Sequence, residues 1–431
     1  MSASPFIRRE VNGIRVHVLP TERFKTHSVS LYAGAPLLEE TVTANAVIPF
    51  VLRRGSADYP ETRAFRARLD ELYGASFGFD VYKRGNNQII QFRLDAVADR
   101  YVPAGAEGGM LREALRFLIG TVCRPALEDG RFTARYVESE KTTVQKRLEA
   151  VINDKIRYAA QRCLEEMFAG DPYRLNALGA IGDLPAITPE TLHNRYRQWL
   201  ADAQLDLYVA GDVTPEAVFG LVAETFAAVR RAPAPYRLGE PPKPKPEAKR
   251  VEEALDVSQG KLNIGLALPV LASDDDYPAA LVYNGILGGF PHSKLFVNVR
   301  EKASLAYYAS SRYDGWKGYA MIQSGIDVRN RDKALSIIEE QLAELAGGRI
   351  TDAELAQTKA LIVSQLNELS DSAFDMIAFD FNGVLTGRGR SPQQLAEAVL
   401  NVAPDDVVRV ARLARMDTVY FLRDRQGGTG E

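Results

Sequence analysis

VREKASLAYY, residues 299–308, is followed by the glycine-containing turn GWKG at 315–318 and by the run YAMIQSGI at 319–326. Turn residues between two runs rich in β-forming residues are typical of a hairpin. We therefore interpret this part of the chain as a helix end that runs into a strand, a hairpin turn and a second strand.

The same pattern occurs a second time, earlier in the chain. LDELYGASFGF at 69–79 precedes a Gly-Asn-Asn turn at 85–87 and a strand-like run at 88–94. A repeat of this length predicts duplicated domains rather than a solenoid of short units. Because hairpins alternate with helical segments, each domain is expected to be of the α+β class, with a mostly antiparallel sheet covered by helices.

A proline-rich segment separates the two copies. Residues 231–252 contain six prolines interleaved with lysines, and proline at this density prevents both a helix and a central strand. We therefore predict a domain over 1–230, a linker over 231–252 and a second domain over 253–431. A chain of 431 residues also exceeds the usual size of one hydrophobic core.

Composition excludes several classes of function. The formal net charge is -3 and no basic block stands out, which argues against a nucleic-acid partner. No stretch approaches the roughly 20 apolar residues of a membrane-spanning helix, and the first residues lack the apolar core of a signal peptide. We expect a chain without a membrane span, located in the cytoplasm of a bacterium, with an organellar matrix as the alternative.

Three stretches together resemble one known family, over most of the chain. They are AVIPFVLRRGS at 46–56; DPY at 171–173 with Gly179, ITP at 187–189 and Tyr196, ahead of VAGDV at 209–213; and LGG at 287–289 with Ser293 and LF at 295–296, ahead of 300–307. On these motifs the chain resembles the insulinase/pitrilysin-type zinc peptidases. The resemblance is to their two-domain bacterial form, which pairs with a second chain.

The resemblance implies a zinc site that this chain has lost. Active members carry the pattern H-x-x-E-H on a helix, with two imidazoles that bind zinc and a carboxylate that activates water. The matching positions here are Ala46, Pro49 and Phe50, and the position of a later glutamate ligand is taken by Arg147 or its neighbour Lys146. None of these side chains suits zinc, and Pro49 is expected to displace or kink its helix.

The remaining candidate ligands do not replace that site. The sequence has four histidines, and no two of them are three or four residues apart, as a chelating pair on a helix would be. The two cysteines form no C-x-x-C pair. We therefore expect that this chain binds no metal and that zinc belongs to a partner subunit.

Arg300 and Tyr307 are the candidate substrate-binding residues. In the family that the chain resembles, a matching Arg/Tyr pair is associated with binding the peptide backbone and stabilising the oxyanion formed during cleavage. The alternative from the residues alone is that Arg300 forms a local salt bridge and Tyr307 packs in the sheet. Gly288 and Gly289 are predicted to form a tight, flexible glycine loop that allows close approach of a chain. They lack the spacing of a nucleotide-binding loop.

These expectations combine into one hypothesis. The chain would be the catalytically inactive subunit of a heterodimeric zinc peptidase, which contributes substrate contacts and chamber wall to a zinc-bearing partner that cleaves peptides. The first alternative is a purely structural or assembly protein. Two others stay open: an independent enzyme with an unrecognised site, and a homodimer without zinc.

Overall fold

The computed structural model of the protein describes residues 5–102, 109–226 and 233–425. The chain divides into two compact units, and each is assembled from three separate segments. Unit 1 consists of Met1–Leu148, Leu175–Arg237 and Leu369–Leu385, and unit 2 of Glu149–Arg174, Leu238–Glu368 and Thr386–Glu431. These units differ from a linear division at residues 230 and 252. The segment Glu149–Arg174 from the first half of the sequence belongs to unit 2, and Leu369–Leu385 from the second half belongs to unit 1. The expected boundary between residues 230 and 231 lies outside the described residues.

Unit 1 contains a six-stranded sheet in the order β1-β2-β8-β3-β5-β4. All neighbouring strands are antiparallel except β2 and β8, which run parallel. The strands are β1 (Ile7–Val11), β2 (Ile14–Pro20), β3 (Thr26–Pro36), β4 (Ser76–Arg84), β5 (Asn87–Val97) and β8 (Gln204–Gly211), and a separate short hairpin pairs β6 (Leu127–Glu128) with β7 (Arg131–Phe132).

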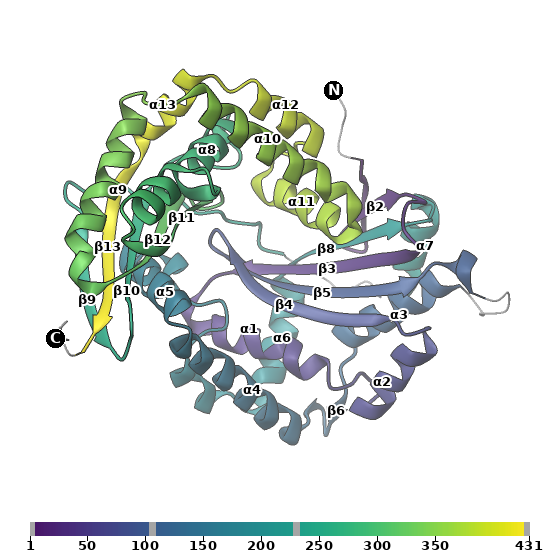
Figure 1. The fold of residues 1–431 in the computed structure, drawn as a ribbon. Coiled ribbons are helices and arrows are strands. Elements are labelled where there is room, and N and C mark those ends of the chain that lie inside the picture. Colours follow the sequence, from purple (N-terminus) through teal and green to yellow (C-terminus); the bar gives the residue numbers. More distant parts are fainter. Residues whose placement is uncertain (1–4, 103–108, 227–232, 426–431) are drawn as a thin grey trace. The chain divides into compact units, whose positions relative to one another are not determined.

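Helices cover one face of this sheet and bury its apolar side chains. Alternate residues such as Val29 and Leu31 of β3 and Phe92 of β5 point into the core shared with those helices. The helices of unit 1 are α1 (Glu39–Leu52), α2 (Thr62–Glu71), α3 (Met110–Cys123), most of α4 (Ala134–Asn153), α6 (Pro189–Asp202), α7 (Pro215–Thr225) and α11 (Ala373–Thr386) (Figure 1).

Unit 2 contains a five-stranded sheet in the order β11-β12-β10-β13-β9, in which only β13 and β9 run parallel. Its strands are β9 (Lys249–Leu255), β10 (Gly260–Ala267), β11 (Ala306–Asp314), β12 (Tyr319–Ile326) and β13 (Arg415–Asp424). Its helices are α5 (Lys155–Met167), α8 (Tyr277–Asn284), α9 (Arg331–Ala346), α10 (Asp352–Glu368), α12 (Pro392–Leu400) and α13 (Pro404–Leu413).

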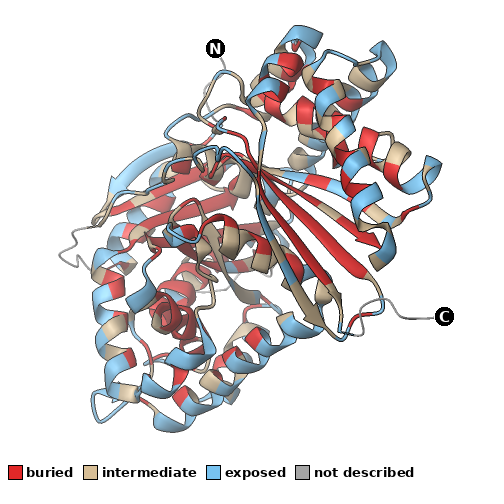
Figure 2. Ribbon diagram, turned by 90° about the vertical axis from the view of Figure 1, so that its left-hand side faces the viewer, coloured by how far each residue is buried: buried red, intermediate tan, exposed pale blue. Residues whose placement is uncertain are grey.

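The two sheets share one topology, which confirms the predicted duplication. When β4, β5, β3, β8 and β2 are matched in turn to β11, β12, β10, β13 and β9, the single parallel pair falls at the same place in each sheet. β1 is the one additional strand. The central strands β3 and β10 are buried along almost their whole length, as the red strands of Figure 2 show. Each unit therefore has its own hydrophobic core, and the predicted α+β fold of two similar domains is confirmed.

Helix α11 comes from the second half of the sequence but packs on the sheet of unit 1. Its Phe381 ring stacks on Tyr32 of β3 with the ring centroids 3.8 Å apart. Its Asp380 accepts hydrogen bonds from the Tyr208 hydroxyl at 2.9 Å and from Arg8 at 2.7 Å. These contacts involve the face of the sheet opposite the main helical core, because Tyr32 alternates with the core residues of β3.

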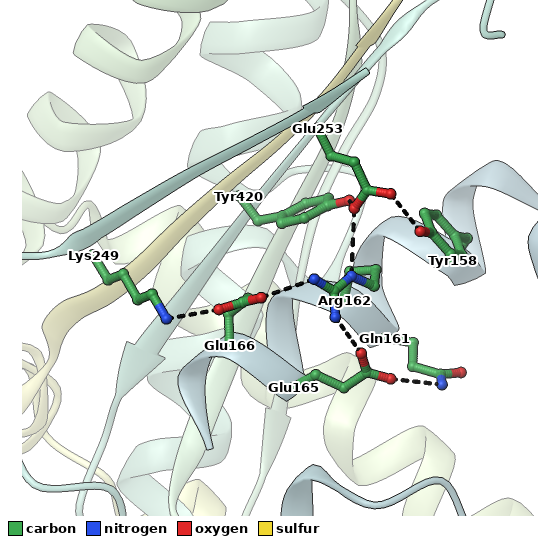
Figure 3. Close-up of polar contacts among 8 residues, drawn as sticks. All are labelled: Tyr158, Gln161, Arg162, Glu165, Glu166, Lys249, Glu253 and Tyr420. Carbon is green, nitrogen blue, oxygen red and sulfur yellow. Dashed lines mark hydrogen bonds and ion pairs between the residues drawn. The ribbon is translucent and has the colours of Figure 1, made fainter. Parts of the chain in front are cut away.

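Helix α5 makes the reciprocal exchange, from the first half of the sequence to the sheet of unit 2. Glu253 of β9 accepts hydrogen bonds from the hydroxyls of Tyr158 and Tyr420 at 2.5 and 2.6 Å and forms an ion pair with Arg162 of α5 (Figure 3). Beyond α5, Asp171 forms a 2.8 Å ion pair with the buried Lys317 of the β11–β12 turn. The D-P-Y motif at 171–173 thus belongs to the contact that holds this exchanged segment on unit 2.

Candidate functional site

Helix α1 carries the positions where the sequence pattern predicts lost metal ligands. Ala46 and Phe50 have no exposed surface, and Pro49 is also buried. Pro49 lies inside α1, which continues to Leu52, and its carbonyl still accepts a hydrogen bond from the Arg53 amide at 3.2 Å. Of the predicted displacement or kink at Pro49, the displacement is wrong, because the last turn forms despite the missing donor and its apolar side chains are buried in the core of unit 1. The kink stays a prediction.

The Phe50 ring is enclosed by another ring and two cations. Phe79 of β4 contacts it edge-on with the ring centroids 4.8 Å apart. The guanidinium carbon of Arg147, on α4, lies 4.8 Å from the Phe50 centroid, and that of Arg53 lies 5.6 Å from it. The sequence pattern assigned positions 50 and 147 to one site although they are almost 100 residues apart, and the fold does bring these two side chains into contact.

Glu140, one of the residues near this site, was not singled out from the sequence. Its carboxylate is completely buried, and it is paired with Arg54 and, at 3.4 Å, with Arg53. Val137 and Val144 are buried on the same face of α4, at spacings of three and four residues from Glu140. A glutamate within that apolar stripe was the signal that could have identified it.

A second polar group beside Ala46 was also missed. Asn45 is buried, donates to the Gln88 side chain at 3.0 Å and accepts from Arg195 of α6 at 2.8 Å. Gln88 in turn donates to the carbonyl of Val42 at 2.8 Å. These bonds tie α1 to β5 and α6, so the helix that resembles a metal-binding helix is fixed in place by packing and amide hydrogen bonds.

These residues do not fit a catalytic zinc ion. Methyl, pyrrolidine and phenyl groups offer no lone pair, and a guanidinium repels a cation. Within the described ranges, no group of three or more His, Cys, Asp or Glu side chains could hold a metal ion elsewhere.

In unit 2, the segment between α8 and β11 has an irregular backbone. Gly285–Gly289 and Phe296–Lys302 are both π-helical, a form that is rare and often found at functional sites. Ser304, which follows, has a positive φ of 51°, an uncommon conformation for a residue with a side chain. Local strain of this kind is retained when the surrounding structure enforces it, and it occurs often at functional sites.

Gly288 and Gly289 lie in the first of these turns, so the prediction of a flexible glycine loop is wrong in its secondary structure. The expected close approach is present, because a Cβ at Gly288 would lie 2.5 Å from the backbone nitrogen of Ser311 on β11. Gly288 is buried, and the missing side chain lets this turn pack directly against the strand.

Arg300 and Tyr307 both project from this irregular segment toward solvent. The pairing of β11 with β12 shifts register between Ala306 and Tyr308, so Tyr307 lies at a β-bulge, and it is 69% exposed. The exposed Arg300 guanidinium lies 4.6 Å from the Phe296 ring centroid, and no ion pair of this side chain is found among the described residues. The local salt bridge of the alternative interpretation is therefore not found for Arg300, and Tyr307 lies in the sheet, as that interpretation expected, but with most of its side chain exposed.

The edges of both sheets are chemically unequal. The edge strands β1 (IRREV) and β9 (KRVEEAL) are rich in charge, which discourages pairing with another strand. The opposite edges, β4 and β11, begin with uncharged stretches at 76–79 and 306–311. β4 contributes Phe79 to the Phe50 contact, and β11 carries Tyr307. Each unit therefore presents a strand edge suited to pairing, next to its candidate residues.

Comparison with known proteins assigns the chain to a family. Residues 186–362 match the family model described as the Peptidase M16 inactive domain. The chain is 38% identical over 423 residues to the "Probable inactive metalloprotease YmfF" of Bacillus subtilis, covering 98% of this chain and 99% of that protein. It is also 21% identical over 400 residues to the "Antilisterial bacteriocin subtilosin biosynthesis protein AlbE" of Bacillus subtilis, covering 92% and 96% of the two chains.

A solved structure shares the fold of this chain. A conserved protein from Enterococcus faecalis superposes with a TM-score of 0.92 at 30% identity, covering 98% of this chain and 99% of that one. The chain belongs to the M16 peptidase family and is similar to its inactive members, so the predicted insulinase/pitrilysin-type resemblance is confirmed. Within its described residues, no helix has both the length and the apolar character needed to cross a membrane.

Proposed function

We propose that this chain is the non-catalytic, peptide-binding subunit of a two-chain zinc peptidase. In this proposal, the zinc ion and the general base belong to a partner subunit of the same family. This chain contributes Arg300, Tyr307 and part of the wall around the substrate.

The chemistry of the α1 region supports the first half of the proposal. Peptide hydrolysis by a zinc peptidase needs a metal-bound water and a carboxylate that accepts its proton. Ala46, Pro49 and Phe50 can do neither, and Arg147 adds positive charge beside them. If the chain takes part in hydrolysis, the metal and the base must therefore come from another polypeptide.

The exposure of Tyr307 at the β11 bulge is the observation that carries the second half. Tyr307 is 69% exposed, so its ring contributes little to folding and its hydroxyl is accessible to a ligand. A phenol and a guanidinium that keep free donors can hydrogen-bond the carbonyl groups of an extended peptide or a developing oxyanion. Arg300 and Tyr307 offer these donors within eight residues of one another.

The uncharged stretches at 76–79 of β4 and 306–311 of β11 suggest how a peptide would bind. An extended peptide can add a strand to an open edge, where backbone hydrogen bonds give affinity that is independent of sequence. Both edges lie next to the candidate residues of their own unit. The name of the relative AlbE, which refers to biosynthesis of the bacteriocin subtilosin, makes precursor peptides one substrate class to test.

A reconstitution assay tests the proposal. Cleavage of a quenched fluorescent peptide library would be measured with this chain, with an H-x-x-E-H partner from the same genome, and with the mixture. We expect cleavage by the mixture alone, sensitive to a chelator. Arg300→Ala should reduce it at least about tenfold, as expected when an oxyanion or backbone donor is removed. The matched control is Arg329→Ala, because Arg329 is also exposed but is paired with Asp327.

A structural or assembly role is the alternative function. It predicts that Arg300→Ala leaves the activity of the mixture unchanged while the two chains still co-elute in size-exclusion chromatography. Chelator-resistant cleavage by this chain alone would instead indicate an independent active site and would contradict the proposal.

A further inference from the structure

The surroundings of Phe50 contain more positive charge than packing requires. Three guanidinium groups, those of Arg53, Arg54 and Arg147, gather around the end of α1, and Glu140 is the carboxylate that pairs with the first two of them. The buried carboxylate of Glu140 carries one negative charge against the two positive charges of Arg53 and Arg54. Arg147 adds a third positive charge and forms no ion pair among the described residues, so the group has an excess of positive charge.

Arg147 is the member of this group that is open to a ligand. It is exposed on α4, and its one polar or cation–π interaction among the described residues is with the Phe50 ring. That interaction uses none of the five N–H donors of the guanidinium group. A guanidinium group beside a ring, with its donors free, is suited to bidentate binding of a carboxylate.

The position of Arg147 connects it to the open edge of β4. Phe50 contacts Arg147 on one side and Phe79 of β4 on another, and the Arg53 guanidinium lies 5.5 Å from the Phe79 centroid. Phe79 lies near the middle of the nine-residue strand β4. A peptide paired with β4 would therefore continue past this point in both directions, and its side chains would alternate between the two faces of the sheet.

We propose that Arg147, supported by Arg53, forms a binding site for an aspartate or glutamate side chain of a peptide paired with β4. This inference rests on the proposed peptide-binding function and specifies its substrate class: extended peptides with an internal acidic residue. A side-chain carboxylate is favoured over a chain terminus, because the strand continues on both sides of Phe79. The protein's own cations would thus give the former metal position a new role in substrate selection.

Fluorescence anisotropy of labelled peptides with the full-length chain tests the site. Two end-blocked peptides would differ by one internal Glu→Gln change. We expect the Glu peptide to bind about fivefold more tightly at low salt, with the difference decreasing as ionic strength rises. Arg147→Gln should remove the difference without weakening the Gln peptide, and Arg147→Glu should favour a Lys peptide. Arg135→Gln is the matched control, because Arg135 is also exposed on α4 and stacked on a ring, that of Tyr136.

The outcomes separate this inference from the function on which it rests. Equal binding of the Glu and Gln peptides by the natural chain would overturn the acidic site and leave peptide binding intact. A preference that survives in Arg147→Gln would also overturn it, as would an Arg147-dependent gain that appears for a free C-terminus instead of an internal Glu. If neither peptide binds, with or without the partner subunit, both the acidic site and the proposed function fail.

Discussion

The two units have the same sheet topology, but their candidate regions differ. The region in unit 1 is buried, whereas the region in unit 2 has an irregular backbone and exposed side chains. In unit 1 the positions matched to a metal site are filled: Ala46 and Phe50 are completely buried, and Asn45 has hydrogen-bond partners. In unit 2 the segment before β11 contains two π-helical turns, and Tyr307 at the start of that strand is exposed. A positive φ precedes the edge strand in both units, at Tyr73 and at Ser304, so it is not part of the contrast. A region without catalytic chemistry can be filled by packing, whereas one that contacts a ligand has a reason to keep an irregular backbone and an exposed side chain.

A substitution of Phe50 tests most directly whether the region in unit 1 is tightly packed. We expect Phe50→Ala to lower the free energy of unfolding by about 3–5 kcal/mol, because it removes a fully buried ring and leaves a cavity. Urea denaturation followed by circular dichroism measures the loss. Tyr101→Ala, which removes a half-exposed ring in the same unit, is the control and should cost less than about 1 kcal/mol. If Phe50→Ala lowered the free energy of unfolding by no more than Tyr101→Ala, the ring of Phe50 would not be tightly packed.

The two units are alike in that each includes a helix from the other half of the sequence. In unit 2 this exchange can be tested at Glu253, which contacts helix α5. Burial raises the pKa of Glu253, but hydrogen bonds from Tyr158, Tyr420 and Arg162 outweigh it and lower the pKa below its ordinary value. The stability that this carboxylate contributes is therefore present above its unfolded pKa and is lost as the pH falls through the folded pKa.

We accordingly expect Glu253→Gln to reduce the free energy of unfolding by about 1 kcal/mol at neutral pH, and this difference should decrease as the pH falls through the lowered pKa of the folded state. Urea denaturation of both forms across this pH range is the measurement. Glu247→Gln, at an exposed position, should show no pH-dependent difference. A constant difference at all pH values would mean that the Glu253 charge does not contribute.

The smallest change in stability is expected at Tyr307. Tyr307→Ala should alter the free energy of unfolding by less than about 0.5 kcal/mol, because the ring is mostly in solvent. Cleavage by the mixed subunits should nevertheless decrease. The neighbouring Tyr308→Ala is the matched control: its ring packs against Gly325, so it should cost about 1–2 kcal/mol. If Tyr307→Ala destabilised the chain as much as Tyr308→Ala, the exposed tyrosine would be structural.

Much of the fold was predictable because its signals are local. The hairpin patterns at 69–94 and 299–326 identified the duplication, which the matching strand orders of the two sheets confirm. The glycine turn at 285–289 was misjudged. Glycines there permit close packing of a π-helical turn against β11, and the local sequence does not distinguish that need from a need for a loop.

The sequence by itself determined the family resemblance, the duplicated α+β architecture and the lack of zinc-binding side chains at positions 46, 49 and 50, because each depends on which residue types occur at short, regular spacings. Only the tertiary structure decided that α5, from the first half of the sequence, packs in unit 2 and that α11, from the second half, packs in unit 1. It also decided that Glu140 is buried between two arginines and that Arg147 lies against Phe50 with its donors free. These features join residues far apart in the chain, and side-chain packing in three dimensions sets them.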